Sequence, residues 1–317
     1  MTIIVTAANH DYLMQFSDRR LSSAGVVVTD QSNKATVLPL ANGRFAVGFT
    51  GMARVGTFEF QSWLVDALYR SAPPDYGIVE TAERLGRELN SLFNNRRQIS
   101  RLSPILKRLT VMMSGYLYAG ARAYIGTIWL TNFQDFVQGV DHPEAAESFD
   151  IAHELEPEDC PPVPSYIQRV GAWDTMTQED ERILRNVLES SPSQMTMLDA
   201  GINIVRRIAE RPRSGNSVGK NVAVVVIPRD RNLEISTRIR LGNGRNDVLL
   251  VDSVQAAVTP TGESNLISIR DIKIEVQQPV ANKAAFQAVL GPNDPCWCNS
   301  NLRFKHCHGR ALSAPMR

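Results

Sequence analysis

The sequence predicts an α+β fold of the four-layer αββα sandwich type, in which two β-sheets pack face to face and each outer face carries a layer of helices. Two observations lead to this prediction. Short runs of β-favouring residues fill positions 2–49 and return at 109–130 and 221–241. Between these blocks, apolar residues recur at helical spacing over residues 60–92 and 178–208. Because a sheet and an amphipathic helix each bury one apolar face, this order fits two sheets that are each covered by a pair of helices.

The first block has the pattern of an antiparallel meander of short strands. Asn9-His10-Asp11 separates the first two runs and is typical of a hairpin turn, and Asn42-Gly43 is a strong signal for a two-residue turn. The strands are expected at Thr2–Ala8, Tyr12–Phe16, Gly25–Thr29, Ala35–Leu38 and Phe45–Phe49.

The later blocks give two pairs of helices and two pairs of strands. Phe60, Leu64 and Leu68 share one helical face, and a second helical run starts at Ile78, beyond the Pro73-Pro74 break. The strands are expected at Leu109–Tyr116, Ala123–Leu130, Asn221–Ile227 and Leu233–Leu241, and the later helices at Gln178–Leu188 and Gln194–Ile208. The Pro-rich stretch from about 141 to 164 is expected to be irregular.

The chain is expected to divide into three segments. Residues 1–245 contain the strands and helices of the sandwich, residues 246–289 have the pattern of a β-rich extension or linker, and residues 290–317 form a small cysteine-containing module. Within the extension, strands are expected at 248–251 and 266–276.

The composition is that of a globular protein with no electrostatic preference for a partner. Hydrophobic residues make up 43% of the 317 positions and charged residues 21%, and 34 basic against 33 acidic side chains give a net charge of +1. This balance predicts no specific binding to nucleic acid and no attraction to a membrane surface. The N-terminus lacks the features of a secretion signal, and apolar runs such as Val222–Ile227 are too short to cross a bilayer. We therefore expect a cytoplasmic protein in which the isolated Cys160 is a free thiol.

The C-terminal residues offer ligands at the spacing of a structural zinc site. Cys296 and Cys298 flank a single residue, and Cys307 and His308 follow together after eight intervening residues. Structural zinc takes four thiolate or imidazole ligands in a closed tetrahedron. The alternative is a reactive or disulfide-bonded cysteine cluster, although three thiols beside a histidine match metal spacing better.

Residues 291–310 closely resemble the SEC-C motif, which is found at the end of the preprotein translocase motor and of many bacterial proteins. Because so short a segment has almost no apolar core, bound Zn²⁺ would supply most of its folding free energy. The resemblance also implies a protein-interaction or ribosome-facing module, with Trp297 and Phe304 as its apolar contacts.

Residue 2 combines a nucleophile and a base. Removal of Met1, which is common before a small residue such as threonine, leaves Thr2 with a free α-amino group. With a pKa of about 8, this amine is a usable base at neutral pH, and it reaches its own hydroxyl directly or through one water.

From Thr2 onward the sequence resembles the proteasome β-subunit family of N-terminal-nucleophile (Ntn) hydrolases. Asp18 and Lys34 lie 16 and 32 residues after the threonine, the separations at which the family places its catalytic aspartate and lysine. The segments similar to the family's opening strand, acidic-basic motif and lysine segment are Thr2–Val5, Ser17–Arg20 and Asn33-Lys34. The resemblance extends over residues 2 to about 240.

This resemblance implies a threonine-type peptide or amide hydrolase that forms a homo-oligomer, since the family assembles into rings. The Lys34 ammonium would favour the Thr2 alkoxide, and Asp18 would hold Lys34 in place. The backbone N–H of Gly48 would stabilise the oxyanion, because its segment resembles the family's glycine turn. The supporting positions are Arg20 in the specificity pocket, Gly51 at the end of that turn, and Ser214 and Gly215, which match a pair that supports the N-terminus.

Two departures from the family pattern keep a second function open. The family has a serine in a turn where this chain has Val170-Gly171-Ala172-Trp173, and an aspartate three residues before the Ser-Gly pair where this chain has Arg211. The alternative is therefore a catalytically inactive proteasome-like scaffold whose SEC-C tail binds a protein or ribosomal partner. Taken singly, Thr2 is an ordinary strand residue, and Asp18 with Lys34 would be a surface ion pair worth under about 1 kcal/mol.

Overall fold

The computed structural model describes residues 2–23, 26–72, 77–120, 122–136, 138–156, 165–190, 192–215, 217–242, 246–247, 253–258 and 264–269. All of them belong to one compact unit, Met1–Ile274, and residues 275–317 make up a second unit. The predictions for the zinc module at 290–317, for the strand at 248–251 and for Cys160 fall outside the described residues.

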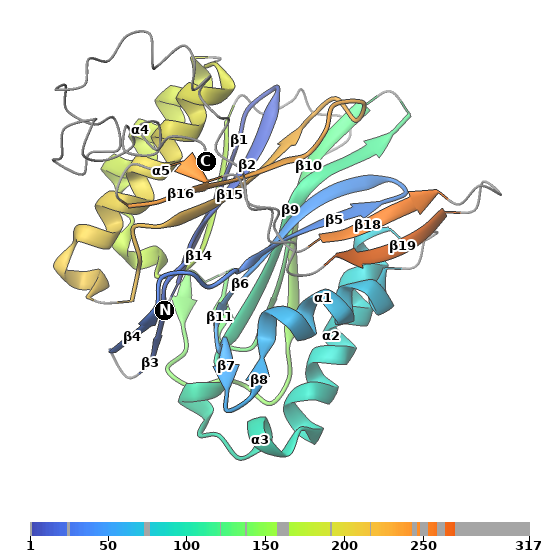
Figure 1. Cartoon of the computed structure of the whole chain (residues 1–317), viewed down its shortest axis with the longest axis vertical. Helices are drawn as coiled ribbons and strands as arrows, with labels where there is room; N and C mark the ends of the chain where they lie inside the picture. The colour runs from blue at the N-terminus through green and yellow to red at the C-terminus, as the bar shows by residue number, and fades with distance from the viewer. Residues whose placement is uncertain are drawn as a thin grey trace, which may run out of the picture. The chain divides into compact units, whose positions relative to one another are not determined.

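Two large sheets contain most of the described strands (Figure 1). The six-stranded sheet has the order β14 (Tyr166–Gly171), β1 (Ile3–Ala8), β2 (Tyr12–Asp18), β15 (Val222–Pro228), β16 (Ser236–Arg240) and β17 (Asn246–Asp247). The seven-stranded sheet has the order β13 (Asp150–Leu155), β10 (Arg122–Thr131), β9 (Leu109–Ala119), β6 (Gly43–Gly51), β5 (Ala35–Leu40), β18 (Ser253–Val258) and β19 (Ser264–Ile269). Three short ribbons are formed by β3 (Leu21–Ser23) with β4 (Val26–Thr29), β7 (Arg54–Val55) with β8 (Phe58–Glu59), and β11 (Gln134–Asp135) with β12 (Val140–Asp141).

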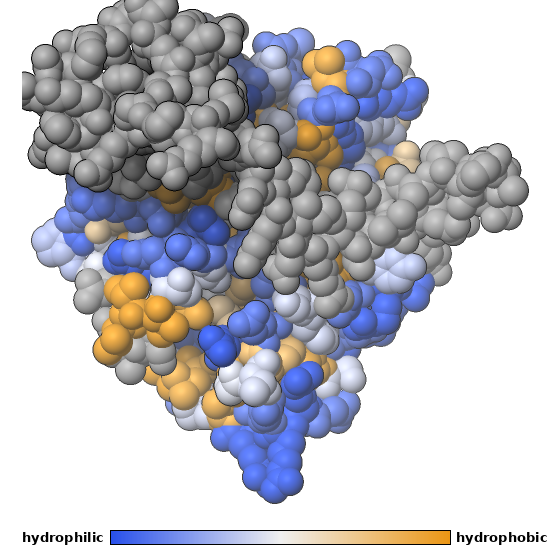
Figure 2. All heavy atoms as spheres, viewed as in Figure 1, coloured by the Kyte–Doolittle hydropathy of each residue, from blue (hydrophilic) through white to orange (hydrophobic). Residues whose placement is uncertain are grey.

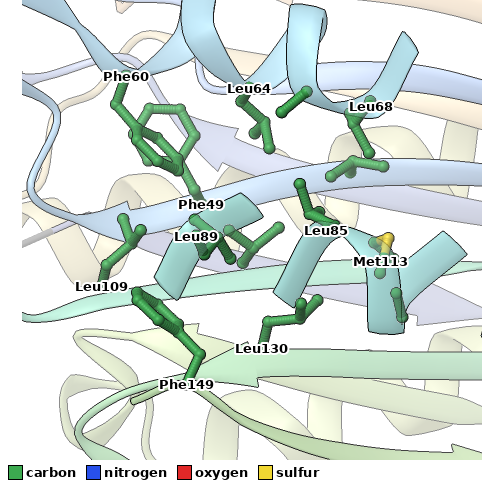
Figure 3. Packing of buried hydrophobic residues seen from close by; sticks show 14 of the residues in the cluster. Phe49, Phe60, Leu64, Leu68, Leu85, Leu89, Leu109, Met113, Leu130 and Phe149 are labelled. Carbon is green, nitrogen blue, oxygen red and sulfur yellow. The ribbon is translucent and has the colours of Figure 1, made fainter. Parts of the chain in front are cut away.

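Each large sheet is covered by a pair of helices. Helices α1 (Phe60–Ser71) and α2 (Ile78–Asn95) share a hydrophobic cluster with the seven-stranded sheet, and α4 (Gln178–Glu189) and α5 (Gln194–Glu210) share one with the six-stranded sheet. Figure 3 shows how Phe60 and Leu64 of α1 and Leu89 of α2 meet Phe49 on the sheet below. The predicted α+β class is confirmed. In the described part of the chain, every helix is too short or too polar to span a bilayer.

The alternating faces of β6 show why the sheets stack as they do. Phe45, Val47 and Phe49 enter the cluster with α1 and α2, whereas Ala46 belongs to a cluster between the two sheets. Gly48 lies on the same inner face, and a Cβ there would come within 2.8 Å of Ile4 Cδ1 on the facing sheet. In β6, large apolar residues therefore point outward to the helices, and small ones let the facing sheet approach.

Polar side chains also lie between the sheets, and several of them make hydrogen bonds there. The hydroxyl of Ser114 accepts hydrogen bonds from Thr6 at 3.3 Å and from Thr127 at 2.9 Å, and Gln15 donates to the carbonyl oxygen of Ala46 at 3.3 Å. Because buried polar groups need such partners, these contacts fix the register of one sheet on the other.

Some strands differ from the sequence prediction. The two-residue turn before β6 is 41–42, and Gly43 already pairs with Leu40, one position from the predicted turn. Strand β13 lies inside the stretch expected to be irregular, and β14 and β18 were not predicted. Strand β13 lies at a sheet edge and is largely exposed, so it lacks the apolar run of a central strand.

Strand β18 lies beside β5 and pairs with it in parallel, and β19 follows β18 at the edge of the sheet. Strands β18 and β19 therefore extend the seven-stranded sheet, whereas β17 extends the six-stranded one. The division of the chain at residues 245 and 289 stays a prediction.

The crossing of α5 over β2 predicts the effect of a single methyl group. A Cβ at Gly201 would lie 2.2 Å from Cζ and 2.5 Å from Cε1 of the fully buried Phe16. Gly201→Ala is expected to destabilise the unit by about 1–3 kcal/mol net, since overpacking outweighs the roughly 1 kcal/mol that alanine gains over glycine in a helix. Urea unfolding measures this change.

Two further variants make the Gly201 result specific. Asn203→Ala, on an exposed position of the same helix, should leave stability unchanged or slightly raised. Phe16→Leu added to Gly201→Ala should recover part of the loss relative to Phe16→Leu alone. Wild-type stability of Gly201→Ala would show that the ring moves aside without cost.

Candidate active site

Three residues that the sequence predicts as catalytic meet at one edge of the sandwich. Thr2 immediately precedes β1, Asp18 ends β2, and Lys34 immediately precedes β5. Because β1 and β2 form an antiparallel hairpin, the start of one lies beside the end of the other. Thr2 is 7% exposed, and the side chains of Asp18 and Lys34 are 0% and 1% exposed, so the surface ion pair considered above does not apply.

The Lys34 ammonium is fully used by its neighbours. Its Nζ donates to Thr2 Oγ1 at 2.5 Å, to Asp18 Oδ2 at 3.4 Å and to the carbonyl oxygen of Arg20. A lysine has three N–H donors, so these contacts account for all of them. The three hydrogen bonds therefore fix the orientation of the Lys34 ammonium beside the Thr2 hydroxyl.

Asp18 gathers backbone from three parts of the chain. Its Oδ1 accepts the N–H of Ile3 at 2.9 Å, and its Oδ2 accepts the N–H groups of Arg20 at 2.9 Å and Gly219 at 3.1 Å. Hydrogen bonds to an ionised carboxylate are stronger than neutral ones, which compensates for the loss of water. Asp18 thus fixes the start of β1, the turn after β2 and the approach to β15.

Burial changes the proton affinity of Lys34. Removal from water lowers the pKa of this amine below its ordinary value, and the charge of Asp18 and its hydrogen bond act in the opposite direction. The lowered pKa brings the exchange of a proton between Lys34 and its surroundings closer to neutral pH. A nitrogen of this kind beside a hydroxyl can stabilise an alkoxide or take up a proton.

The carbonyl oxygen of Thr2 is held separately from its side chain. It accepts the N–H of Ala172 at 2.9 Å and the hydroxyl of Thr50 at 3.2 Å. Gly171, at the end of β14, has a φ of 89°, and a Cβ there would lie 1.9 Å from this same oxygen. Only glycine allows the chain to pass so close. Thr2 is therefore held by hydrogen bonds at both its hydroxyl and its carbonyl oxygen.

Three of these residues were missed by the sequence analysis as parts of the site: Thr50, Gly171 and Gly219. Gly171 stood in a segment noted only for lacking a serine, and Thr50 stood beside the predicted Gly51. No local sequence pattern marks Gly219, because glycine is needed there only where its backbone passes close to Arg20. A Cβ at this position would lie 2.8 Å from Cβ of Arg20.

Arg20 contributes its backbone to the site and its side chain elsewhere. Its guanidinium pairs with both carboxylate oxygens of Asp30, with Nε–Oδ1 at 2.6 Å and Nη2–Oδ2 at 3.0 Å. This hydrogen bond raises the pKa of Arg20 and lowers that of Asp30, so both stay charged. The pair joins the two ends of the β3–β4 ribbon, next to the Arg20 carbonyl oxygen that accepts a hydrogen bond from Lys34. A place for Arg20 in a specificity pocket stays a prediction.

The other supporting positions have structural contacts of their own. Gly48 packs against Ile4, and Gly51, with a φ of 103°, passes so close to the carbonyl oxygen of Arg108 that a Cβ would lie 2.0 Å from it. The Ser214 hydroxyl donates to the carbonyl oxygens of Ile208 and Arg211 near the end of α5, and Gly215 follows with a φ of 50°. The site roles of Gly48, Gly51, Ser214 and Gly215 stay predictions.

A cleft of about 290 Å³ adjoins the sequence neighbours of Arg20 and Lys34. Its walls come from the base of the β3–β4 ribbon, the loop before β5, the end of β6, and α1. The lining residues are Leu21, Thr29, Gln31, Ser32, Asn33, Phe49, Ala53, Arg54, Glu59, Gln61 and Ser62. The ribbon beside it exposes three valines, Val26–Val28, and Figure 2 shows hydrophobic surface in the region where Figure 1 draws β3 and β4.

The described residues contain no group of three or more His, Cys, Asp or Glu side chains that could hold a metal ion. The four predicted zinc ligands, Cys296, Cys298, Cys307 and His308, lie outside the described residues.

Lys34→Met is expected to remove a pH dependence of stability. Burial lowers the pKa of Lys34 in the folded state, so between that value and the ordinary 10.5 the unfolded chain binds more protons than the folded chain. The free energy of unfolding of the wild type therefore rises with pH in this window, and the variant lacks that rise. Urea unfolding from neutral pH to about pH 10 measures both slopes. Lys220→Met, at an exposed lysine, is the control, and equal slopes in wild type and Lys34→Met would contradict the assignment.

Comparison with protein-family models identifies a SEC-C motif at residues 293–310. This range contains all four predicted ligands, and the SEC-C motif is typically a metal-binding motif. Over 57 residues the chain is 42% identical to the protein translocase subunit SecA of two Pseudomonas putida strains. The match covers 18% of this chain, and the chain spans 6% of the length of these curated relatives.

Among solved structures, the chain is similar to Anbu (ancestral beta-subunit) from Yersinia bercovieri, with a TM-score of 0.43 and 15% identity over 72% of this chain and 82% of that one. It is also similar to a mutant of Anbu from a Hyphomicrobium species, with a TM-score of 0.42 and 13% identity over 91% of this chain and 96% of that one. The protein is thus structurally similar to Anbu and carries a C-terminal SEC-C motif.

Proposed function

We propose that this chain is a threonine-type amide or peptide hydrolase of the Ntn class, with a proteasome-like αββα sandwich, and that it acts through Thr2 once Met1 has been removed. One observation carries the proposal. The Nζ of a buried lysine lies 2.5 Å from the hydroxyl oxygen of the one residue that loss of Met1 would make N-terminal. The chain buries a charged pair, Lys34 with Asp18, to achieve this contact, and such burial is costly unless every group is paired.

In the acylation step, Thr2 Oγ1 forms a bond to the carbonyl carbon of the substrate. The hydroxyl proton passes to the free α-amino group, directly or through one water. The Lys34 ammonium stabilises the developing alkoxide and, by like-charge repulsion, keeps the α-amine unprotonated beforehand. Backbone N–H groups, with Gly48 as the candidate, stabilise the oxyanion. The C–N bond then breaks, and the proton on the α-amine leaves with the amine product.

In the second step, water attacks the ester that links the acyl group to Thr2. The α-amine takes a proton from this water, and the carbon–oxygen bond to Oγ1 breaks as the carboxylic acid forms. The proton returns to Oγ1, which restores the starting state of Thr2. The α-amine is thus a base in both halves of the reaction, and no co-reactant other than water is needed.

The substrate is proposed to place a side chain in the cleft beside Asn33. Hydroxyl and amide groups dominate its walls, among them Thr29, Gln31, Ser32 and Ser62. These groups favour a polar side chain next to the scissile amide, because an apolar one would leave them without partners.

The C-terminal module is proposed to bind one structural Zn²⁺ and to dock a protein or ribosomal partner. Three thiolates and one imidazole form a closed tetrahedral set, which leaves no open position for substrate. This donor set fits a structural site. We further propose that the chain forms a homo-oligomer, as its resemblance to the proteasome family implies.

The Thr2 assignment predicts that a peptide β-lactone or epoxyketone labels the protein once, at Thr2. The intact mass should lack Met1 and gain one adduct, and Thr2→Ala should gain none. Lys34→Met should lower the rate constant of labelling by roughly 10²–10³-fold, the usual cost of removing one group that stabilises developing negative charge. Mass spectrometry of the intact and digested protein measures these changes.

A control variant at another lysine distinguishes the specific effect of Lys34 on labelling from the general loss of one positive charge. Lys220→Met, at an exposed lysine paired with Glu210, should label at the wild-type rate. Retention of Met1 together with absence of any adduct would refute the hydrolase and favour the alternative, a catalytically inactive scaffold that works through its SEC-C tail.

The zinc assignment predicts one Zn²⁺ per chain by elemental analysis. Cys298→Ser should lose it, because a structural site needs all four ligands. Cys160→Ser should keep it, since this cysteine lies far from the motif in sequence. The labelling rate of Thr2 should stay the same in both variants. Equal zinc content in Cys298→Ser and wild type would contradict the ligand set.

A further inference from the structure

Arg211 joins α5 to the short helix η3 (Pro212–Ser214) and makes contacts in two directions. Its Nη1 donates to the carbonyl oxygen of Thr175 at 2.6 Å and to Asp180 Oδ2 at 2.5 Å. Its own carbonyl oxygen accepts the hydroxyl of Ser214 at 2.7 Å. Arg211 stands where the family resemblance leads one to expect an aspartate, so its contacts show what the substituted residue does in this chain.

One path of contacts runs from the Arg211 side chain to the nucleophile. Thr175 ends the short helix η2 (Trp173–Thr175), and both its N–H and its hydroxyl donate to the carbonyl oxygen of Ala172, at 3.1 Å and 2.5 Å. The N–H of Ala172 in turn donates to the carbonyl oxygen of Thr2 at 2.9 Å. Arg211 therefore holds one end of a closed turn, and Thr2 is attached to the other end.

A second path runs from the Arg211 backbone to the carboxylate. Ser214 donates to the Arg211 carbonyl oxygen, and Ser217 donates from its hydroxyl to the Ser214 carbonyl oxygen at 2.5 Å. Two residues later, the N–H of Gly219 donates to Asp18 Oδ2 at 3.1 Å. The segment that supplies this hydrogen bond to Asp18 thus begins at Arg211.

Asp180 holds the Arg211 guanidinium in place. Its side chain is 1% exposed, and it also accepts the N–H and the hydroxyl of Thr177 at 3.0 and 2.9 Å, in the capping box of α4. Although burial by itself raises the pKa of the Asp180 carboxyl, the hydrogen bonds from Arg211 and Thr177 bring it below its ordinary value. The carboxylate is therefore charged at neutral pH. Arg207 lies 3.4 Å from the other oxygen, Oδ1.

We propose that Arg211, paired with Asp180, is a positioning residue for Thr2. Its side chain fixes the turn that donates a hydrogen bond to the Thr2 carbonyl oxygen. Its backbone carbonyl begins the segment that donates a hydrogen bond to the Asp18 carboxylate. As a role in catalysis this inference rests on the proposed function, whereas its structural part does not. Without the Arg211 side chain, the turn at 172–175 loses the hydrogen bond to the carbonyl oxygen of Thr175.

Hydrogen exchange tests the structural part of the proposal. Arg211→Met should speed exchange of the Ala172 amide by roughly 10- to 100-fold, the factor that corresponds to loss of a hydrogen bond to a charged group. The variant keeps the backbone carbonyl of residue 211, so exchange of the Gly219 amide should rise by a smaller factor. Arg207→Met removes another arginine from the same carboxylate but leaves the Thr175 contact, so it should change neither amide. Arg211→Lys should restore part of the protection.

A double variant covers the case in which Arg211→Met unfolds because Asp180 is left as an unpaired buried charge. Arg211→Met with Asp180→Asn removes the charge, keeps an acceptor for Thr177 and still loses the Thr175 contact, so the same faster exchange is expected. Unchanged exchange at Ala172 and Gly219 in the folded variants would overturn the proposal.

The rate constant of Thr2 labelling by a peptide β-lactone tests the catalytic part. It should fall by roughly 10- to 100-fold in Arg211→Met, the cost of a small misplacement of a reacting group. It should stay at the wild-type value in Arg207→Met. Wild-type labelling in a folded Arg211 variant would overturn the positioning role. Absence of labelling in the wild-type protein would instead refute the proposed function, and the exchange data would still decide the structural part.

Discussion

The site depends on the burial of a lysine ammonium between a hydroxyl and a carboxylate. Removal of each ion from water costs several kcal/mol, and their attraction offsets this only when the remaining hydrogen-bonding groups are satisfied. Lys34 and Asp18 meet that condition with backbone groups from three separate segments. The path of the chain around Thr2 therefore follows from the hydrogen bonds that this one buried charged pair requires. A fold without these converging segments would expel the lysine to the surface.

The two sheets supply the rigid frame for this pair. Their outer faces carry large apolar side chains against the helices, and on its inner face β6 presents the small residues Ala46 and Gly48, the latter against Ile4 of β1. This difference lets β1 and β6 approach closely, so Thr50 on one sheet reaches the carbonyl oxygen of Thr2 on the other. Thr2 thus lies at an edge shared by both sheets, where neither side chain nor backbone can relax without disturbing the packing.

The parts of the site that the sequence predicted are those set by local geometry. A hairpin made of β1 and β2 places its first residue beside its last, so the interval of 16 residues between Thr2 and Asp18 is a direct result of strand and turn lengths. Lys34 follows after one further ribbon. The helices were predictable for a similar reason, since their apolar faces repeat within a few residues.

The remaining parts come from contacts between distant positions, which periodicity does not encode. Asp18 and Gly219 are 201 residues apart, and Arg211 reaches Thr175 across 36. Strands β13 and β14 were missed for a related reason: both lie at sheet edges, where β13 is largely exposed, half of β14 is only partly buried, and no continuous apolar run appears. Gly171 shows the limit most clearly, because its need for glycine comes from a φ of 89° and from the close approach of the Thr2 carbonyl oxygen, near the start of the chain.

The long sequence separation between these contacting residues also sets an order of events during synthesis. The groups that hold Thr2 and Asp18 come from Ala172 and Gly219, so the pocket around residue 2 closes only after the ribosome has made more than two thirds of the chain. At about 5–20 residues per second, this leaves the N-terminus accessible for roughly 10–40 s. An aminopeptidase that acts on the nascent chain therefore meets Met1 before the fold exists.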